Sequence, residues 1–307
     1  MIKKSKEELP IIIDFAYSEI DQTLIAATSN KKLFFWEVKI SKPSHALQIE
    51  KQFLDPNIKP CSAKFIYTFS SVLPITSVYY LKKLGLVVMV TSEIKLTILK
   101  FFKKFDIYNL QKIAQIDESS GSKIHQDVIL CVVEAWKSGY LITGGLDGKI
   151  KVWDARGYAK LLSEGKSIGK ASFKFLGDLS KSTTTESGGR AVSKLKSASH
   201  KKAVTQMTSL ATANVTTNKR GIRKLCYSNA LNGIVLSVGF SNSMEVWSPD
   251  TSLSKAYIGK LDGHTRVVQD VKFITGSLSC ISIDEGFSIR VWDVRKLEII
   301  HVIKEET

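Results

Sequence analysis

The sequence predicts an all-β fold, a β-propeller built of about five four-stranded blades. Three segments end in a tryptophan followed by Asp or Ser, and each comes after a short apolar run and a turn containing Gly or Ser: 148–154, 243–248 and 288–293. Trp247 and Trp292 lie one blade length apart, since a self-similar unit of roughly 40–45 residues ending in Trp-Asp is typical of propeller blades. Short runs of β-branched and aromatic residues between turn residues are frequent, and helix-period patterns are scarce.

We expect one propeller domain over residues 1–307, with four strands in each blade from the ring axis outward. The blades are expected at residues 11–53, 75–116, 128–162, 222–261 and 267–303. The first contains a looser tryptophan segment around Trp36 and an outermost strand at 46–53, and the outermost strand of the third is expected at 158–162. Closed rings hold about four to eight blades. Because both ends of the chain lie close to blade strands with no capping segment, we expect an incomplete ring or part of a larger propeller, with closure by another chain or a strained five-blade ring as alternatives.

A basic, hydroxyl-rich segment separates the third and fourth expected blades. Residues 163–220 hold 18 Ser or Thr and 11 Lys or Arg against 3 Asp or Glu, and so carry more than half of the net charge of +15. Such a composition buries too little apolar surface to offset its ordering entropy. We expect a disordered insertion, with an added strand or short helix at 203–210 as the alternative.

The composition argues against a membrane-spanning, a secreted and a metal-binding protein. Hydrophobic residues make up 44% of the chain, and no apolar run approaches the roughly 18 residues of a membrane span. The apolar run at 11–13 is too short for a secretory signal. The four cysteines form no CxxC pair and have no His at zinc-ligand spacing, so we expect buried thiols in a reducing, intracellular compartment and no metal or cofactor. These cysteines are Cys61, Cys131, Cys226 and Cys280.

Four residues near the third tryptophan segment resemble a catalytic group. A His near an Asp and a hydroxyl is the arrangement that activates a nucleophile. However, Asp147 falls in the turn six residues before Trp153, Thr143 lies on the strand ten residues before it, and His125 precedes the first strand of the blade. This spacing favours a buried hydrogen-bond network, which must be fully paired to be stable.

The recurring tryptophans, the Gly263-His264 pair and two Trp-Asp pairs together resemble the WD40-repeat propellers over residues 11–303, apart from the insertion. In that family His, Ser or Thr, Asp and Trp join the strands of one blade by hydrogen bonds. The resemblance implies such a staple at the following residues: His125, Thr143, Asp147 and Trp153; His264, Ser282 and Trp292; Ser237 and Trp247; Trp36.

The staple is expected to be incomplete in four of the five blades. In the fifth, Gly286 occupies the Asp position. The fourth has Ser241 in place of the Asp and lacks the His, and the first has Ala26 and Asn30 at the hydroxyl and Asp positions. The second has no tryptophan in its third expected strand. These blades should therefore rely more on apolar packing.

One subgroup of that family is especially similar over residues 222–303. The segments 236–242, 246–249, 261–264, 281–286 and 291–295 resemble the cilia- and flagella-associated WD-repeat proteins. Membership in that subgroup implies a scaffold role in the axoneme, in the cytoplasm or cilium.

The predicted function is a non-catalytic scaffold for protein–protein interactions. The basic segment 163–220 is expected to bind an acidic protein surface or tail and to be tuned by phosphorylation. The alternatives are a protein of RNA-containing assemblies that uses basic loops, which would place it in the nucleus, and a trafficking scaffold. An enzyme has little support, because the sequence shows no metal cluster, nucleophile elbow or suitably placed pair of carboxylates.

Overall fold

The computed structural model describes residues 10–40, 61–116, 125–156 except 138, 174–178, 221–249 except 231 and 232, and 256–303. The elements in these ranges are all β-strands, and they form five four-stranded antiparallel sheets. In each sheet the strands lie in chain order, so every strand pairs with its neighbours in sequence. The all-β prediction is confirmed, and the arrangement is compatible with a propeller.

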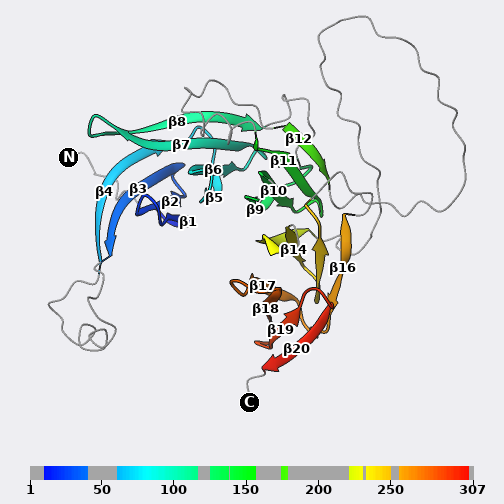
Figure 1. The fold of residues 1–307 in the computed structure, drawn as a ribbon. Coiled ribbons are helices and arrows are strands. Elements are labelled where there is room, and N and C mark those ends of the chain that lie inside the picture. Colours follow the sequence, from blue (N-terminus) through cyan, green and yellow to red (C-terminus); the bar gives the residue numbers. More distant parts are fainter. Residues whose placement is uncertain are drawn as a thin grey trace, which may run out of the picture. The chain divides into compact units, whose positions relative to one another are not determined.

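The chain divides into two compact units, with the division at the start of β9. The first unit contains the first and second sheets (Figure 1). The first sheet consists of β1 (Ile12–Ser18), β2 (Thr23–Thr28), β3 (Lys32–Ile40) and β4 (Cys61–Ser70). The second sheet consists of β5 (Ile75–Leu81), β6 (Leu86–Thr91), β7 (Leu96–Lys104) and β8 (Ile107–Ile116).

The outermost strand of the first sheet lies beyond its expected range. We expected it at 46–53, which falls outside the described residues, whereas the strand that pairs with β3 is β4. Phe65 of β4 lies opposite Trp36, and Phe69 lies opposite Leu33. The alternating aromatic residues of β4 match the apolar residues of β3, and these cross-strand pairs set the register.

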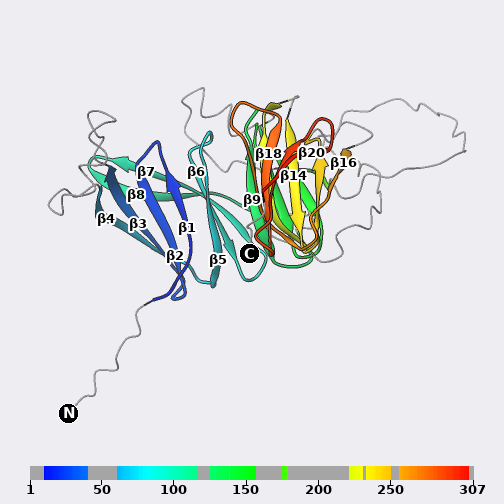
Figure 2. The same ribbon diagram turned by 90° about the horizontal axis from the view of Figure 1, so that it is seen from below.

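The second unit contains three sheets, which Figure 2 shows stacked beside one another. The third sheet consists of β9 (Ile129–Ala135), β10 (Tyr140–Gly145), β11 (Ile150–Asp154) and β12 (Lys174–Asp178). The fourth consists of β13 (Ile222–Ser228), β14 (Ile234–Gly239), β15 (Ser243–Trp247) and β16 (Tyr257–Asp262). The fifth consists of β17 (Val268–Phe273), β18 (Ser279–Asp284), β19 (Ile289–Asp293) and β20 (Glu298–Ile303).

Strand β12 lies inside the segment that we expected to be a disordered insertion. It pairs with β11, and Phe175 lies opposite Trp153. A short apolar stretch within the polar segment 163–220 therefore supplies the fourth strand of this sheet. The rest of that segment, including 203–210, and the expected strand at 158–162 fall outside the described residues.

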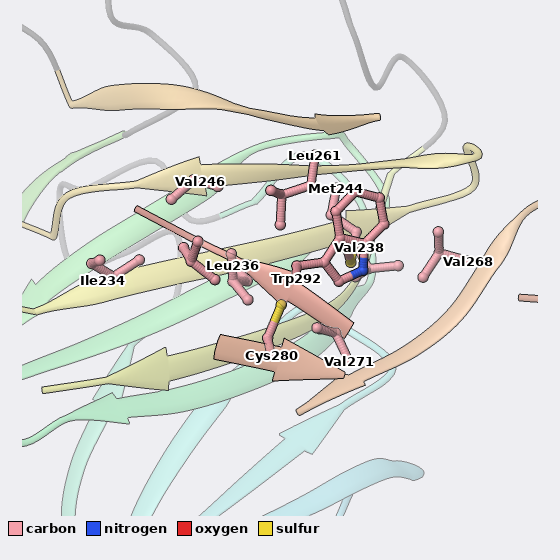
Figure 3. Packing of buried hydrophobic residues seen from close by; sticks show 11 residues of the cluster. Ile234, Leu236, Val238, Met244, Val246, Leu261, Val268, Val271, Cys280 and Trp292 are labelled. Atoms are coloured by element: carbon pink, nitrogen blue, oxygen red, sulfur yellow. The ribbon is translucent and has the colours of Figure 1, made fainter. Parts of the chain in front are cut away.

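Each pair of neighbouring sheets within a unit packs face to face through a core of apolar side chains. Every residue of β6 and of β14 is buried, because side chains on both faces of these inner strands are covered. The core between the fourth and fifth sheets is shown in Figure 3. It contains Ile234, Leu236, Val238, Met244, Val246, Leu261, Val268, Val271, Cys280, Trp292 and Val294.

The core between the fourth and fifth sheets predicts a large difference between two substitutions in the fourth sheet. Leu236→Ala should lower the free energy of unfolding by about 2–5 kcal/mol, because it leaves a cavity among fully buried side chains. The control Ile258→Ala, on the exposed side of β16, should cost about 0.5 kcal/mol or less. Urea unfolding followed by tryptophan fluorescence measures both, and equal losses would contradict the assignment of this core.

Candidate functional site

A tryptophan paired with a buried hydroxyl recurs in the three sheets of the second unit. The indole Nε1–H of Trp153 donates to Thr143 Oγ1 at 3.1 Å. Trp247 donates to Ser237 Oγ at 2.8 Å, and Trp292 donates to Ser282 Oγ at 2.7 Å. The ten-residue spacing places each pair diagonally on adjacent antiparallel strands, where side chains on one face meet. The sequence-predicted pairs of tryptophan and hydroxyl therefore lie together.

The most extensive polar network lies in the fifth sheet. His264, which precedes β17, places Nε2 2.6 Å from Ser282 Oγ and Nδ1 2.8 Å from Asp284 Oδ2. Asp284 Oδ1 also accepts the backbone N–H groups of Gly286 at 2.9 Å and Ser288 at 3.0 Å. Four side chains thus join the segment before β17 to β18 and β19.

The hydrogen bonds assign one tautomer to His264. Ser282 Oγ accepts from the Trp292 indole, so its own proton is free to be donated to His264 Nε2. Nδ1 then carries the ring proton and donates it to the Asp284 carboxylate. Every polar hydrogen of the network is used when the imidazole is neutral and the carboxylate is ionised.

The pKa values of His264 and Asp284 are both lowered, which favours the neutral imidazole and the ionised carboxylate that this proton arrangement requires. Burial lowers the pKa of His264 below its ordinary value of 6.5, against the raising effect of the bond to Asp284, and the nearby Arg290 lowers it further. Burial alone would raise the pKa of Asp284. The hydrogen bonds that its carboxylate accepts from His264, Ser288 and Gly286 outweigh burial, and the pKa lies below 3.8.

The role of Asp284 corrects the expectation that the fifth blade lacks its acidic residue. Gly286 occupies the position where the third blade has Asp147, but the carboxylate comes from Asp284, two residues earlier, and Gly286 donates its N–H to it. The sequence carried a signal for this, because an Asp whose side chain bonds the backbone N–H two residues on is a common turn. His264, Ser282, Asp284 and Trp292 are therefore joined in one hydrogen-bond network.

The remaining sequence-predicted residues differ in their surroundings. His125 is buried, and the carboxylate of Asp147 accepts the backbone N–H of Lys149 at 3.1 Å within its turn. Trp36 is only partly buried and contacts Phe34 and Phe65, with ring centroids 5.8 and 6.4 Å away. Ala26, ten residues before Trp36, offers no hydroxyl.

The linkage of Ser282, His264 and Asp284 has the connectivity of a nucleophile, a base and an orienting acid. However, these residues are only 1%, 3% and 2% exposed, and Ser282 Oγ already accepts a hydrogen bond from Trp292. In this arrangement a substrate has no access to the Ser282 hydroxyl. The three linked side chains instead join neighbouring strands.

Other reactive groups in the described ranges are also held inside the sheets. Cys131 and Cys280 are buried free thiols, as expected, whereas the free thiol Cys226 is only partly buried. Burial raises the pKa of Cys131 and raises that of Cys280 to about 12. The thiolate, which is the reactive form, is therefore disfavoured at both positions. Across the described residues, no three His, Cys, Asp or Glu side chains are grouped so as to hold a metal ion.

Comparison with known proteins gives one partial similarity. No protein-family model matches the chain. A stretch of 88 residues, 29% of the chain, is 32% identical to the cilia- and flagella-associated protein 337 B of Tetrahymena thermophila. The match spans only 7% of the length of that protein. In the described part of the chain, no helix has the length and hydropathy needed to cross a bilayer.

Removing the hydroxyl should cost more in the fifth sheet than in the fourth. Ser282→Ala leaves both the Trp292 N–H and His264 Nε2 without this partner. Each buried polar group left unpaired costs about 1–3 kcal/mol, so we expect a loss of about 2–5 kcal/mol. The matched variant Ser237→Ala removes the partner of the Trp247 N–H and should cost about 1–3 kcal/mol. Chemical unfolding of both variants checks the ranking, and a smaller loss for Ser282→Ala would refute the shared-hydroxyl network.

The network should make folding stability fall with acidification. The pKa values of His264 and Asp284 are both lower in the folded state than their ordinary values of 6.5 and 3.8. The unfolded chain therefore binds more protons, and stability is lost as the pH falls below about 6.5 and then below about 3.8. Thermal unfolding between pH 7.5 and 5, a span of roughly one unit or more on each side of the ordinary His pKa, measures the first step. His264→Gln should flatten it, and an unchanged slope would exclude His264 as its source.

Proposed function

We propose that the chain forms blades of a WD40-type β-propeller and acts as a non-catalytic scaffold for protein–protein interactions in a ciliary or axonemal complex. The observation that carries the proposal is the repeated bond between a strand tryptophan and a hydroxyl ten residues earlier, in successive four-stranded antiparallel sheets. The similarity of part of the chain to a cilia- and flagella-associated protein supports the ciliary assignment.

The packing supports a scaffold role. Sheets that are stacked through dense apolar cores resist deformation, so loops at their ends present side chains at fixed positions. The group formed by Ser282, His264 and Asp284, which has the connectivity of a catalytic triad, is buried and internally paired. We therefore propose that the polar network stabilises the blade and takes no part in a reaction.

The charge of the segment 163–220 supports an acidic protein partner. Its 11 basic residues against 3 acidic ones attract a negatively charged tail, of the kind that tubulin presents on microtubules. Such an attraction is screened by salt over about 10 Å at 0.1 M ionic strength. Its 18 Ser and Thr residues offer sites where phosphate would cancel the positive charge and release the partner.

A charge-neutralised variant tests this proposal without changing the chain length. The variant replaces Lys194, Lys196, Lys201 and Lys202 by Gln. It should lose most of its salt-sensitive co-sedimentation with microtubules and its axonemal localisation in a ciliated cell. The control removes the same charge from the first unit, at Lys82, Lys83, Lys103 and Lys104, and should retain both properties.

Two outcomes would reject the proposal. Equal losses in the two variants would mean that the net charge of the chain, rather than the segment 163–220, drives binding. Retention in the nucleus with salt-sensitive RNA binding would instead favour a role in an RNA-containing assembly.

A further inference from the structure

One face of the fifth sheet, which we name the forward face, carries four apolar side chains that are exposed or partly exposed. It consists of Ile281, Ile289, Val291 and Ile303. Ile281 and Ile303 are 40% and 49% exposed, and the other two are partly exposed. Ile281 pairs with Val291 and Ile289 pairs with Ile303, so the four side chains share one side of three adjacent strands.

The same positions in the fourth sheet form a buried interface. Leu236, Met244 and Val246 have the same spacing from Trp247 as Ile281, Ile289 and Val291 have from Trp292, and Leu261 is equivalent to Ile303 by strand pairing. Leu236 pairs with Val246 and Met244 pairs with Leu261, which reproduces the register of the forward face. All four are fully buried against the fifth sheet (Figure 3). The forward face therefore has the residues and register of a surface that receives another sheet.

The side of the fifth sheet that packs on the fourth defines the matching surface. It carries Val271, Cys280 and Trp292, and Trp292 lies opposite Ile299. Cys280 lies opposite Trp292, and Val271 lies opposite Ser282.

The first sheet exposes the equivalent of this matching surface, which we name the tryptophan face. It consists of Phe15, Leu24, Trp36 and Phe65. Leu24 lies opposite Trp36, which in turn lies opposite Phe65, and Phe15 lies opposite Ala26, as in the fifth sheet. However, Phe15 and Phe65 are 68% and 54% exposed. Contiguous exposed apolar surface of this kind marks an interaction site.

We propose that the forward face of the fifth sheet in one molecule binds the tryptophan face of the first sheet in a second copy of this chain. The contact repeats the packing that joins the fourth and fifth sheets. A second copy is the occupant because the chain itself carries both halves of that interface, each in the register needed. Since two different surfaces meet, the association is head to tail, and it generates a ring where the rotation closes.

Two complementary double variants test this proposal in the full chain. Ile281→Lys with Ile303→Lys disrupts only the forward face, and Phe15→Lys with Phe65→Lys disrupts only the tryptophan face. Light scattering coupled to size-exclusion chromatography should show an oligomer for the unaltered chain and a monomer for each variant alone. An equimolar mixture should form a one-to-one dimer, because each variant retains the face that the other lacks.

The control and the remaining outcomes make the test decisive. Phe105→Lys removes an exposed aromatic side chain that belongs to neither face and should leave the oligomer unchanged. Circular dichroism confirms that each variant is folded, and for an unfolded variant Thr replaces Lys at the same positions. A monomeric unaltered chain overturns the proposal, as does a mixture that stays monomeric. Oligomers of the Phe15/Phe65 variant alone also overturn it, because the fifth sheet would then pair with itself.

Discussion

Burial of Trp247 and Trp292 in the cores between neighbouring sheets is the interaction on which the stacking of the second unit depends. Trp153, Trp247 and Trp292 are 0–1% exposed. A buried tryptophan removes a large apolar area from water, but its indole N–H must find an acceptor. The hydroxyls of Thr143, Ser237 and Ser282 meet that need. Apolar packing and one polar bond therefore hold adjacent strands and adjacent sheets together.

The variation between sheets follows from this constraint. In the fifth sheet the hydroxyl is shared with His264, which extends the network to Asp284 and fixes the segment that precedes β17. In the first sheet Ala26 replaces the hydroxyl, and Trp36 is partly exposed among aromatic neighbours. A hydroxyl partner is thus present where the tryptophan is fully buried and absent in the first sheet, where Trp36 is partly exposed.

The same packing rule connects structure with the proposed scaffold role. A sheet that is apolar on both faces needs a neighbour on each side, and this requirement leads to repeated stacking. Reactive groups such as the Cys280 thiol and the Ser282 hydroxyl are buried in the interior. The described surface available to partners then consists of loops and exposed sheet faces.

Much of the strand pattern could be predicted from the sequence because it depends on local periodicity. The strands at 75–81, 86–91, 234–239 and 298–303 lie within three of the blades that were expected from the sequence. The pairing of each tryptophan with a hydroxyl ten residues earlier was expected from the resemblance to the WD40-repeat propellers, and three sheets of the second unit contain it. The sequence by itself therefore determined the all-β class, the repeating unit and the bonded pairs in the second unit.

The tertiary structure alone decided the features that depend on partners distant in the chain. The fourth strands of the first and third sheets, β4 and β12, are selected by pairing with β3 and β11, across long connections. The acidic residue of the network is Asp284 and not the expected position 286. The carboxylate is set by its closeness to His264, and the number of residues before Trp292 does not predict it. The exposure of individual side chains was also decided by the tertiary structure. Leu236 and Ile281 are equivalent in sequence, yet only the first is covered, because burial depends on whether a neighbouring sheet packs against that face.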